Sequence, residues 1–286
     1  MERELVDRAA ALLLEARSEG LRIPGLPENL KPTDVESAYA IQAATLAAIL
    51  EDAGGGTFVG RKIGATNVTA QEQLGLSEPF HGILMSAFVH QSPAELPADA
   101  FFMRVLEPEI AFRLGADLPA SGAPYDAAAV KPAIATVMGA IEVVDSRYSS
   151  WTTVGGLQLI ADNASAGHWL HGEEFENLDI IDYASQPVSL TLNAEVVQEG
   201  STGNALGSPL NALAWLANDV ARLGQGLRAG ELITTGTCTV VVPAEAGDRA
   251  SADFGPLGPV RVRFTRVPAP GRSSIVRGRV NSDPKF

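Results

Sequence analysis

An α+β fold is predicted for this chain of 286 residues by the order of its hydrophobic patterns. Residues 1–55 carry helical spacing, and the pattern then changes to strand-like segments with one late helix. The chain lacks both the regular alternation of strands and helices that indicates a doubly wound sheet and a glycine-rich phosphate loop. We therefore expect a single domain over residues 1–267, with a helical N-terminal portion at 1–55 and a β-rich core at 56–267.

Two helices are predicted in the N-terminal portion and one near the end of the core. Residues 4–17 place leucines and alanines at helical spacing. A second helix is expected to begin after Thr33 or Asp34 as its capping residue and to run through Ile49. Residues 209–223 begin with proline, carry one apolar face and are followed by glycine, which is typical of a helix with defined ends.

The strand predictions come from apolar or alternating segments bounded by Gly, Pro and Ser. The predicted β segments cover residues 57–63, 82–90, 104–114, 139–144, 188–197, 231–242, 249–254 and 260–267. The single cysteine, Cys238, lies in one of these apolar runs and is expected to be a buried structural thiol, since one cysteine forms neither an internal disulfide nor a zinc cluster.

Charge and hydropathy exclude several classes of protein. A net charge of −13 argues against nucleic acid as a partner, because phosphate binding needs basic surfaces. The apolar runs are interrupted or too short to cross a bilayer, and no targeting pattern is recognised, so we expect no membrane partner and a cytoplasmic protein. Residues 268–286 are basic and rich in Pro, Gly and Ser, which predicts a flexible tail.

A pair of glutamates marks the strand predicted at residues 104–114. Residues two apart in a strand share a face, so Glu107 and Glu109 stand together opposite an apolar face. Two carboxylates this close repel in a site of low dielectric unless a cation neutralises them, and Mg²⁺ or Mn²⁺ prefers such oxygen ligands. A solvated polar face is the alternative. Pro108 between them indicates an edge strand or a bulge, because proline cannot donate to a ladder.

Three further segments favour a site over a solvated face. Glu142 stands in an apolar, strand-like run, where a glutamate is seldom buried without a partner. Lys62 is a cation between glycines that allow close backbone approach. The neighbours Asp162 and Asn163 are short polar side chains between apolar stretches. Taken alone, Lys62 would be a surface residue and the Asp-Asn pair a turn, but together they predict a metal site.

Seven segments, in this order, resemble the fumarylacetoacetate hydrolase superfamily, and within it the branch of 2-keto-4-pentenoate hydratases and 4-oxalocrotonate decarboxylases. The resemblance extends from about residue 32 to residue 267. The segments are SAYAIQ (37–42), GRKIG (60–64), EPEIA (107–111), IEVVDSR (141–147), ADNAS (161–165), LGSPLNA (206–212) and LRAGE (227–231), the last running into Thr235 and Gly236.

The resemblance implies a mixed β roll, a homo-oligomer that could associate with a pathway enzyme, and a divalent metal, Mg²⁺ or Mn²⁺, held by three carboxylates. The implied metal ligands are Glu107, Glu109 and Glu142, and the implied catalytic residues are Lys62 and Ser165. The substrate would be a small 2-oxo acid, and the metal would act as a Lewis acid that stabilises its enolate. The substrate-binding residues are expected among Arg61, Arg147, Asp162, Asn163, Thr235 and Gly236. Either arginine could instead form an internal salt bridge.

The chain departs from that branch at positions that bear on the reaction. Hydratases of the branch usually carry Asp where this chain has Phe80, and His81 beside it is a candidate replacement as a proton carrier. A structural turn histidine is the alternative for His81. The family's Gly-His-Pro appears as Gly207, Ser208 and Pro209. We expect a hydratase of 2-hydroxy-2,4-dienoates in aromatic-compound degradation. The alternatives are a 2-oxo acid decarboxylase, a C–C hydrolase and a non-catalytic assembly paralogue.

Overall fold

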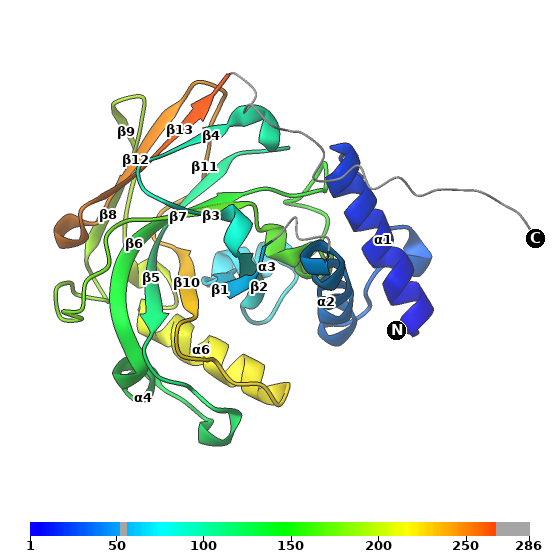
Figure 1. Cartoon of the computed structure of the whole chain (residues 1–286), viewed down its shortest axis with the longest axis horizontal. Coiled ribbons are helices and arrows are strands. Elements are labelled where there is room, and N and C mark those ends of the chain that lie inside the picture. Colours follow the sequence, from blue (N-terminus) through cyan, green and yellow to red (C-terminus); the bar gives the residue numbers. More distant parts are fainter. Residues whose placement is uncertain (52–55, 267–286) are drawn as a thin grey trace, which may run out of the picture.

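A computed structural model describes residues 1–51 and 56–266, in which two β-sheets pack together and two long helices lie beside them (Figure 1). The combination confirms the predicted α+β class. The helices are α1 (Arg3–Glu19), α2 (Val35–Glu51), α3 (Val68–Leu74), α4 (Ala127–Val130), α5 (Gly156–Ala161) and α6 (Pro209–Arg222).

The larger sheet runs in the order β2-β1-β10-β5-β6-β7-β3, and β11 also pairs with β5. It contains β1 (Phe58–Gly64), β2 (Phe80–Met85), β3 (Val89–Gln91), β5 (Val105–Leu114), β6 (Ile134–Val144), β7 (His168–His171), β10 (Leu232–Thr237) and β11 (Val242–Pro243). The smaller sheet runs in the order β4-β13-β12-β8-β9. It contains β4 (Ala94–Pro97), β8 (Pro187–Leu192), β9 (Glu195–Ser201), β12 (Arg249–Asp253) and β13 (Pro259–Thr265).

The larger sheet curls until its two ends meet. Strands β2 and β3 stand at opposite ends of the sheet order, yet only the short turn Ser86–Phe88 separates them along the chain. The interior of the curl holds one apolar cluster with side chains from β2, β5, β6, β7 and β10, and partly buried residues of β1 and β3 pack against it. Because β1–β10 and β3–β7 are parallel and the other pairs are antiparallel, the predicted mixed β roll is confirmed.

The outer face of the roll packs against the smaller sheet. Along β5, Leu106, Ile110 and Phe112 point outward and are completely buried, as the alternation predicted. They join the main core with residues of the smaller sheet such as Val262 and Phe264. Cys238 belongs to the same core and is fully buried, as expected. The inner face of β5 is thereby left for the polar side chains.

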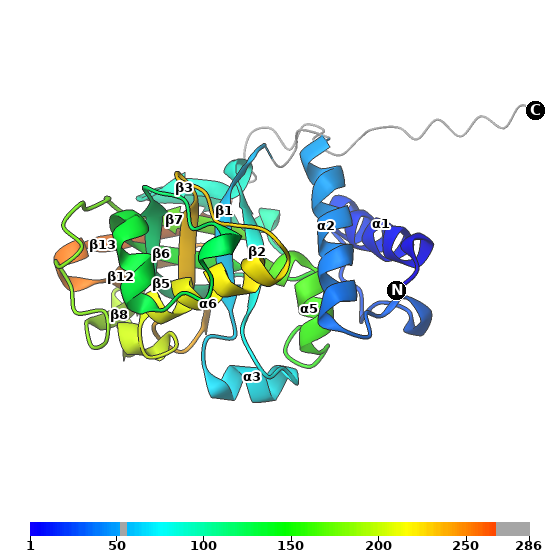
Figure 2. The same ribbon diagram turned by 90° about the horizontal axis from the view of Figure 1, so that it is seen from below.

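The N-terminal helices pack on each other and on α5. Helix α1 ends at Gly20, whose left-handed φ of +66° allows its N–H to bond the carbonyl of Ala16. Helix α2 begins after Asp34, whose Oδ1 accepts the N–H of Ser37 at 2.7 Å, so the predicted Asp34 cap is confirmed. Figure 2 shows α5 between β2 and α2, and α2 and β2 both contact α5. The helical portion therefore covers the β2 side of the roll.

Several predicted elements differ in extent from those observed. The strand predicted at 82–90 is two strands, β2 and β3, because the chain crosses from one end of the sheet to the other. The segment 188–197 is a hairpin of β8 and β9, whose turn residues Asn193 and Ala194 both have positive φ. The segment 231–242 divides into β10 and β11. Short elements such as α3, α5 and β7 escaped prediction because they span one or two turns or four residues.

Of the two alternatives that Pro108 indicated, an edge strand or a bulge, the structure excludes the edge strand. Strand β5 pairs with β10 on one side and β6 on the other. The alternative, a local irregularity, fits better, since the register of β10 against β5 shifts between Thr234 and Thr237, beside Glu109. The missing N–H of proline is tolerated where the ladder is already interrupted.

The predicted tail at residues 268–286 lies outside the described residues. Within residues 1–51 and 56–266, none of the helices combines the length and the apolar character that crossing a membrane requires.

Gly60 should tolerate no side chain, because β1 and β10 approach closely there. A Cβ on Gly60 would overlap the carbonyl oxygen of Leu232, which is backbone and cannot move aside. We expect Gly60→Ala to lower the free energy of unfolding in urea by about 1–3 kcal/mol. The control is Gly172→Ala, whose Cβ would lie 3.2 Å from a methyl group of Val260. Equal stability of both variants would contradict the close approach.

Candidate active site

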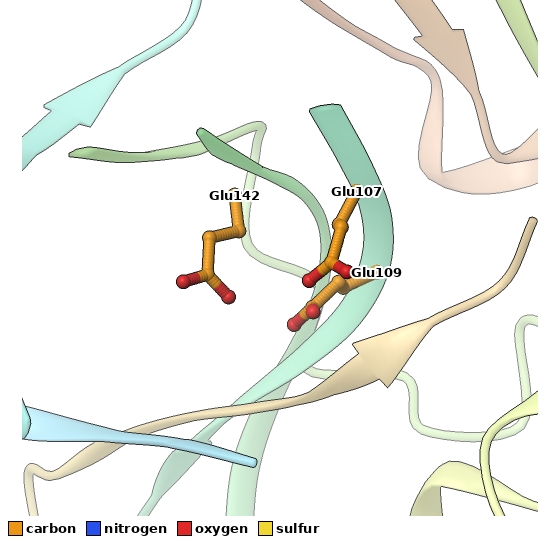
Figure 3. A group of neighbouring side chains, drawn as sticks. All are labelled: Glu107, Glu109 and Glu142. Carbon is orange, nitrogen blue, oxygen red and sulfur yellow. The ribbon is translucent and has the colours of Figure 1, made fainter. Parts of the chain in front are cut away.

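Three glutamate side chains converge inside the roll. Glu107 and Glu109 project from β5, and Glu142 projects from β6, where it pairs with Glu107 in the antiparallel register. Each contributes a carboxylate oxygen to a group whose members all lie within 4.8 Å of one another. Figure 3 shows the carboxyl groups facing the same space. Strand alternation and the β5–β6 register together produce this arrangement.

Burial makes the triad electrostatically unfavourable without a cation. Burial, together with the charges of Glu142 and Glu107, holds the pKa of Glu109 well above its usual range. Burial also raises the pKa of Glu142 to about 7, against the opposing charge of Lys62. Thr234 donates its hydroxyl to Glu109 Oε2, whereas Glu109 Oε1 and Glu142 Oε2 are buried without a hydrogen-bond partner among the described residues. These oxygens are free to bind a cation.

Lys62 supplies the positive charge beside the triad. Its Nζ lies 3.0 Å from Glu142 Oε1 and donates to the carbonyl oxygen of Ala164, also at 3.0 Å. Burial by itself would lower the pKa of this ammonium, but the neighbouring glutamates outweigh it and raise the pKa. Lys62 is therefore charged at neutral pH. An ammonium has three N–H donors, so one remains for a ligand.

A left-handed turn places Ser165 beside Lys62. Asn163, Ala164 and Ser165 have φ values of 51°, 55° and 55°, an arrangement that costs about 1–3 kcal/mol for each non-glycine residue. The Asn163 side chain holds the turn, because its Oδ1 accepts the N–H of Ile83 and its Nδ2 donates to the Ile83 carbonyl. Ser165 Oγ is buried and lacks a partner within the described residues. The turn thus leaves the Ser165 hydroxyl unpaired, and the Asn163 side chain is used to hold the turn in place.

The two arginines expected at the substrate are engaged elsewhere. Arg147 is buried, and its Nε donates to Asp162 Oδ1 at 2.6 Å. Arg61 Nε lies 3.4 Å from Glu231 Oε2. Arg61 also precedes Lys62 in β1, so its side chain points to the opposite face of the sheet. The polar groups of Arg147 and Asp162 are therefore bound to each other, and Arg61 is paired with Glu231. The structure does not bring any of these three residues to the glutamate triad.

The Thr235–Gly236 segment shapes the wall of the roll. Thr235 donates its hydroxyl to the carbonyl oxygen of Ile110 at 2.7 Å. Gly236 has a φ of +99°, and a Cβ there would overlap the side chain of Thr66. Thr235 and Gly236 thus maintain the backbone of the roll, whereas the neighbouring Thr234 contacts the triad through Glu109.

His81 and Phe80 separate onto different faces of β2. Phe80 and Gly82 share the face of Lys62, since Gly82 pairs with Lys62 in the β1–β2 register. His81 points away, stacks on Tyr39 with ring centres 4.5 Å apart, and has Nδ1 2.8 Å from Asp219 Oδ2. Burial lowers the pKa of His81, so the neutral ring donates its Nδ1–H to the carboxylate. The structure therefore does not bring His81 to the triad.

A cavity adjoins Glu142 and contains residues that the sequence did not single out. Its volume is about 10 Å³, room for about one water molecule, and its lining includes Leu84, Met85, Trp169 and His168. Trp169 pairs with Glu142 in the β6–β7 register, and its indole Nε1–H is buried without a partner among the described residues. The only sequence signal was the apolar pair Trp169–Leu170 between two histidines in β7, which is too short to be specific. Trp169 is a donor available to a ligand.

Comparisons with known proteins agree with this geometry. A family model described as Fumarylacetoacetate (FAA) hydrolase C-terminal matches residues 60–265. The TodF product hydratase of Pseudomonas putida strain F1 is 35% identical over 264 residues, 92% of this chain and 96% of that protein. A 2-keto-4-pentenoate hydratase of Paraburkholderia phymatum is 36% identical over 260 residues, 91% of this chain and 97% of that protein.

Among solved structures, one similar chain is the 4-oxalocrotonate decarboxylase from Pseudomonas putida G7, complexed with magnesium and adipate. Its TM-score is 0.86 at 29% sequence identity, and the match covers 92% of this chain and 98% of that one.

Replacement of Arg147 should destabilise the fold strongly. Arg147→Met leaves Asp162 as an uncompensated buried charge, which is expected to cost about 3–5 kcal/mol in the free energy of unfolding. The control is Arg228→Met, because the Arg228–Asp117 pair is exposed and its loss should cost under about 1 kcal/mol. Urea denaturation of both variants measures the difference, and similar values would show that the buried pair is not needed.

Acid should destabilise the fold through His168. Burial, followed by the charges of His90 and Arg17, lowers the pKa of His168 to about 3, whereas an unfolded histidine has a pKa of about 6.5. Because the folded pKa is the lower one, this contribution to stability is full above pH about 6.5 and is lost as the pH falls toward 3. Between pH 7 and pH 5, unfolding free energy should fall less steeply in His168→Gln than in the wild type. An unchanged slope would contradict the assignment.

Proposed function

Because the chain belongs to the fumarylacetoacetate hydrolase family, we propose that it is a divalent-metal-dependent lyase that hydrates 2-hydroxy-2,4-dienoates, the dienol tautomers of 2-oxo-4-enoates. In that reaction the dienol becomes an unsaturated 2-oxo acid, and the H and OH of water then add across its distal double bond. The observation that carries the proposal is the triad of Glu107, Glu109 and Glu142, the last two of which are buried, beside the buried ammonium of Lys62.

The triad fits a divalent cation. Its members are hard oxygen donors, and two of their buried oxygens have no protein partner in the described part of the chain. Mg²⁺ and Mn²⁺ both suit such a set of carboxylates. When bound, the cation would act as a Lewis acid that stabilises negative charge developing on the 2-oxo oxygen of the substrate.

Lys62 and Ser165 would handle protons and orientation. The remaining N–H of Lys62 can donate to a substrate carboxylate or to the oxygen of the dienol. The left-handed turn holds the free Ser165 hydroxyl close to Lys62, because Lys62 already binds the carbonyl of Ala164. The indole of Trp169 offers a further donor from β7. These groups are fixed before a ligand arrives, which lowers the entropic cost of orienting it.

Decarboxylation of a 2-oxo acid is the second candidate, favoured by Phe80. This side chain is buried, packs against Ala164 and has no group that could activate water. The 2-oxo group on which negative charge develops during hydration would equally accept the electrons released as CO₂ leaves. A C–C hydrolase or a non-catalytic assembly paralogue would be further outcomes of the test below. A homo-oligomer, an association with a pathway enzyme and a cytoplasmic location stay predictions.

The test is turnover of 2-hydroxypenta-2,4-dienoate with Mg²⁺ or Mn²⁺, followed by loss of the dienol absorbance. Release of CO₂ from 2-oxo-3-hexenedioate would instead identify a decarboxylase. If no 2-oxo acid is turned over with either metal, the proposed function is wrong.

Glu109→Gln should abolish turnover while preserving the fold. The change removes a charge from the triad, so thermal stability without metal should be equal or higher, and the rise in Tm on adding Mn²⁺ should disappear. Glu173→Gln, at an exposed carboxylate, is the control and should keep both activity and the metal-induced rise. A fully active Glu109→Gln variant would exclude this carboxylate as a metal ligand.

A further inference from the structure

Thr234 is a completely buried polar residue to which the proposed function gives no role. It lies in β10 between two strands of the site, since it pairs with Lys62 of β1 and with Ala111 of β5. Its side chain shares the inner face of the roll with Leu232, two residues earlier in the strand. From there its hydroxyl donates to Oε2 of Glu109. Thr234 is therefore the residue of β10 that contacts the triad.

The hydroxyl of Thr234 is held rigidly. Strand β10 has a hydrogen-bonded strand on each side, so its backbone cannot shift without breaking two ladders. A threonine side chain has few χ1 rotamers, because two heavy atoms branch from its Cβ. The exposed fraction is 0% for Glu109 and for Thr234, which excludes bulk water from the contact. The donor is thus fixed before any cation arrives.

The contact leaves Glu109 with a single unoccupied oxygen. Its Oε2 accepts from Thr234, whereas Oε1 is buried and has no hydrogen-bond partner among the described residues. Glu142 repeats the pattern, because its Oε1 lies 3.0 Å from Nζ of Lys62 and its Oε2 has no partner in the same part of the chain. Each of the two buried glutamates therefore has one oxygen, not two, free for a cation.

The number of free oxygens bears on which cation the triad prefers. Mg²⁺ requires octahedral geometry with short bonds of about 2.0–2.1 Å, whereas Ca²⁺ accepts roughly 6–8 oxygens and often takes both oxygens of one carboxylate. A carboxylate with one oxygen bound elsewhere suits the smaller ion. Loss of the Thr234 hydroxyl would free Oε2 and allow the carboxyl group of Glu109 to turn.

We propose that Thr234 is a positioning residue that holds Glu109 as a one-oxygen ligand, and that it thereby favours Mg²⁺ or Mn²⁺ over Ca²⁺ at the triad. Thr234 acts through Glu109 and not on a substrate. Removal of a group that hydrogen-bonds a metal ligand typically lowers metal affinity about 10- to 100-fold. The proposal rests on the proposed function only for the presence of a divalent cation at the triad.

The test is calorimetric titration of the wild type, Thr234→Val and Thr234→Ser with MnCl₂ and with CaCl₂, without substrate. Valine has nearly the shape of threonine but no hydroxyl, so Kd for Mn²⁺ should rise about 10- to 100-fold. Kd for Ca²⁺ should rise less, because Ca²⁺ can use the freed Oε2 of Glu109. Serine keeps a hydroxyl, so Thr234→Ser should recover most of the Mn²⁺ affinity.

Thr202→Val is the matched control. Thr202 is also completely buried, and its hydroxyl donates to the carbonyl oxygen of Asp182 at 3.1 Å. Both valine variants lose one buried hydrogen bond, so both should have a lower Tm without metal. Only Thr234→Val should change the affinity for Mn²⁺, which separates positioning of Glu109 from a general loss of stability. Thr234→Ala removes the same hydroxyl and replaces Thr234→Val if the latter does not fold.

The outcomes separate this proposal from the proposed function. Mn²⁺ binding by Thr234→Val that equals that of the wild type would overturn the role of Thr234, as would equal losses of affinity for Mn²⁺ and Ca²⁺. A wild type that binds neither ion would overturn it together with the proposed metal dependence. A wild type that binds Mn²⁺ but turns over no 2-oxo acid would refute only the proposed function, and the variants would still decide the role of Thr234.

Discussion

The convergence of three carboxylates, two of them fully buried, inside one curled sheet is the constraint on which the rest of the site depends. Glu107, Glu109 and Glu142 repel one another in a space from which water is largely excluded. A single ammonium, Lys62, offsets only part of this charge. The roll tolerates the remainder because its outer face is a large apolar core that stabilises the fold independently. The site is thus unfavourable by itself, and a divalent cation would relieve it.

The surroundings of the triad fix polar groups rather than leave them mobile. Asn163 binds both backbone groups of Ile83 and so maintains three consecutive left-handed residues. That turn directs the Ala164 carbonyl to Lys62 and leaves the Ser165 hydroxyl unpaired. Backbone strain at this point is compatible with a binding role, since strained residues persist only where surrounding contacts hold them.

The N-terminal helices do more than cover the roll. Helix α2 supplies Tyr39, which stacks on His81, and the His81–Asp219 contact connects β2 with α6. These contacts lie on the face away from the triad, so they hold the edge strand that carries Gly82 opposite Lys62. Helix α1 supplies Arg17, whose guanidinium carbon lies 5.8 Å from the centre of the Phe88 ring. The helical portion therefore contacts both β2 and the Ser86–Phe88 turn that follows it.

The sequence by itself determined the features that depend on local pattern. Strand alternation placed Glu107 and Glu109 on one face, helical spacing with the Asp34 cap defined α2, and the resemblance of ordered segments indicated the β roll. Tertiary structure alone decided which polar residues meet, because pairing between distant strands sets those contacts. It engaged Arg147 with Asp162 and Arg61 with Glu231, turned His81 away from the triad, and brought Trp169 to the cavity beside Glu142. A sequence pattern predicts on which face of its strand a side chain lies, whereas the curl of the sheet determines which residues lie opposite that face.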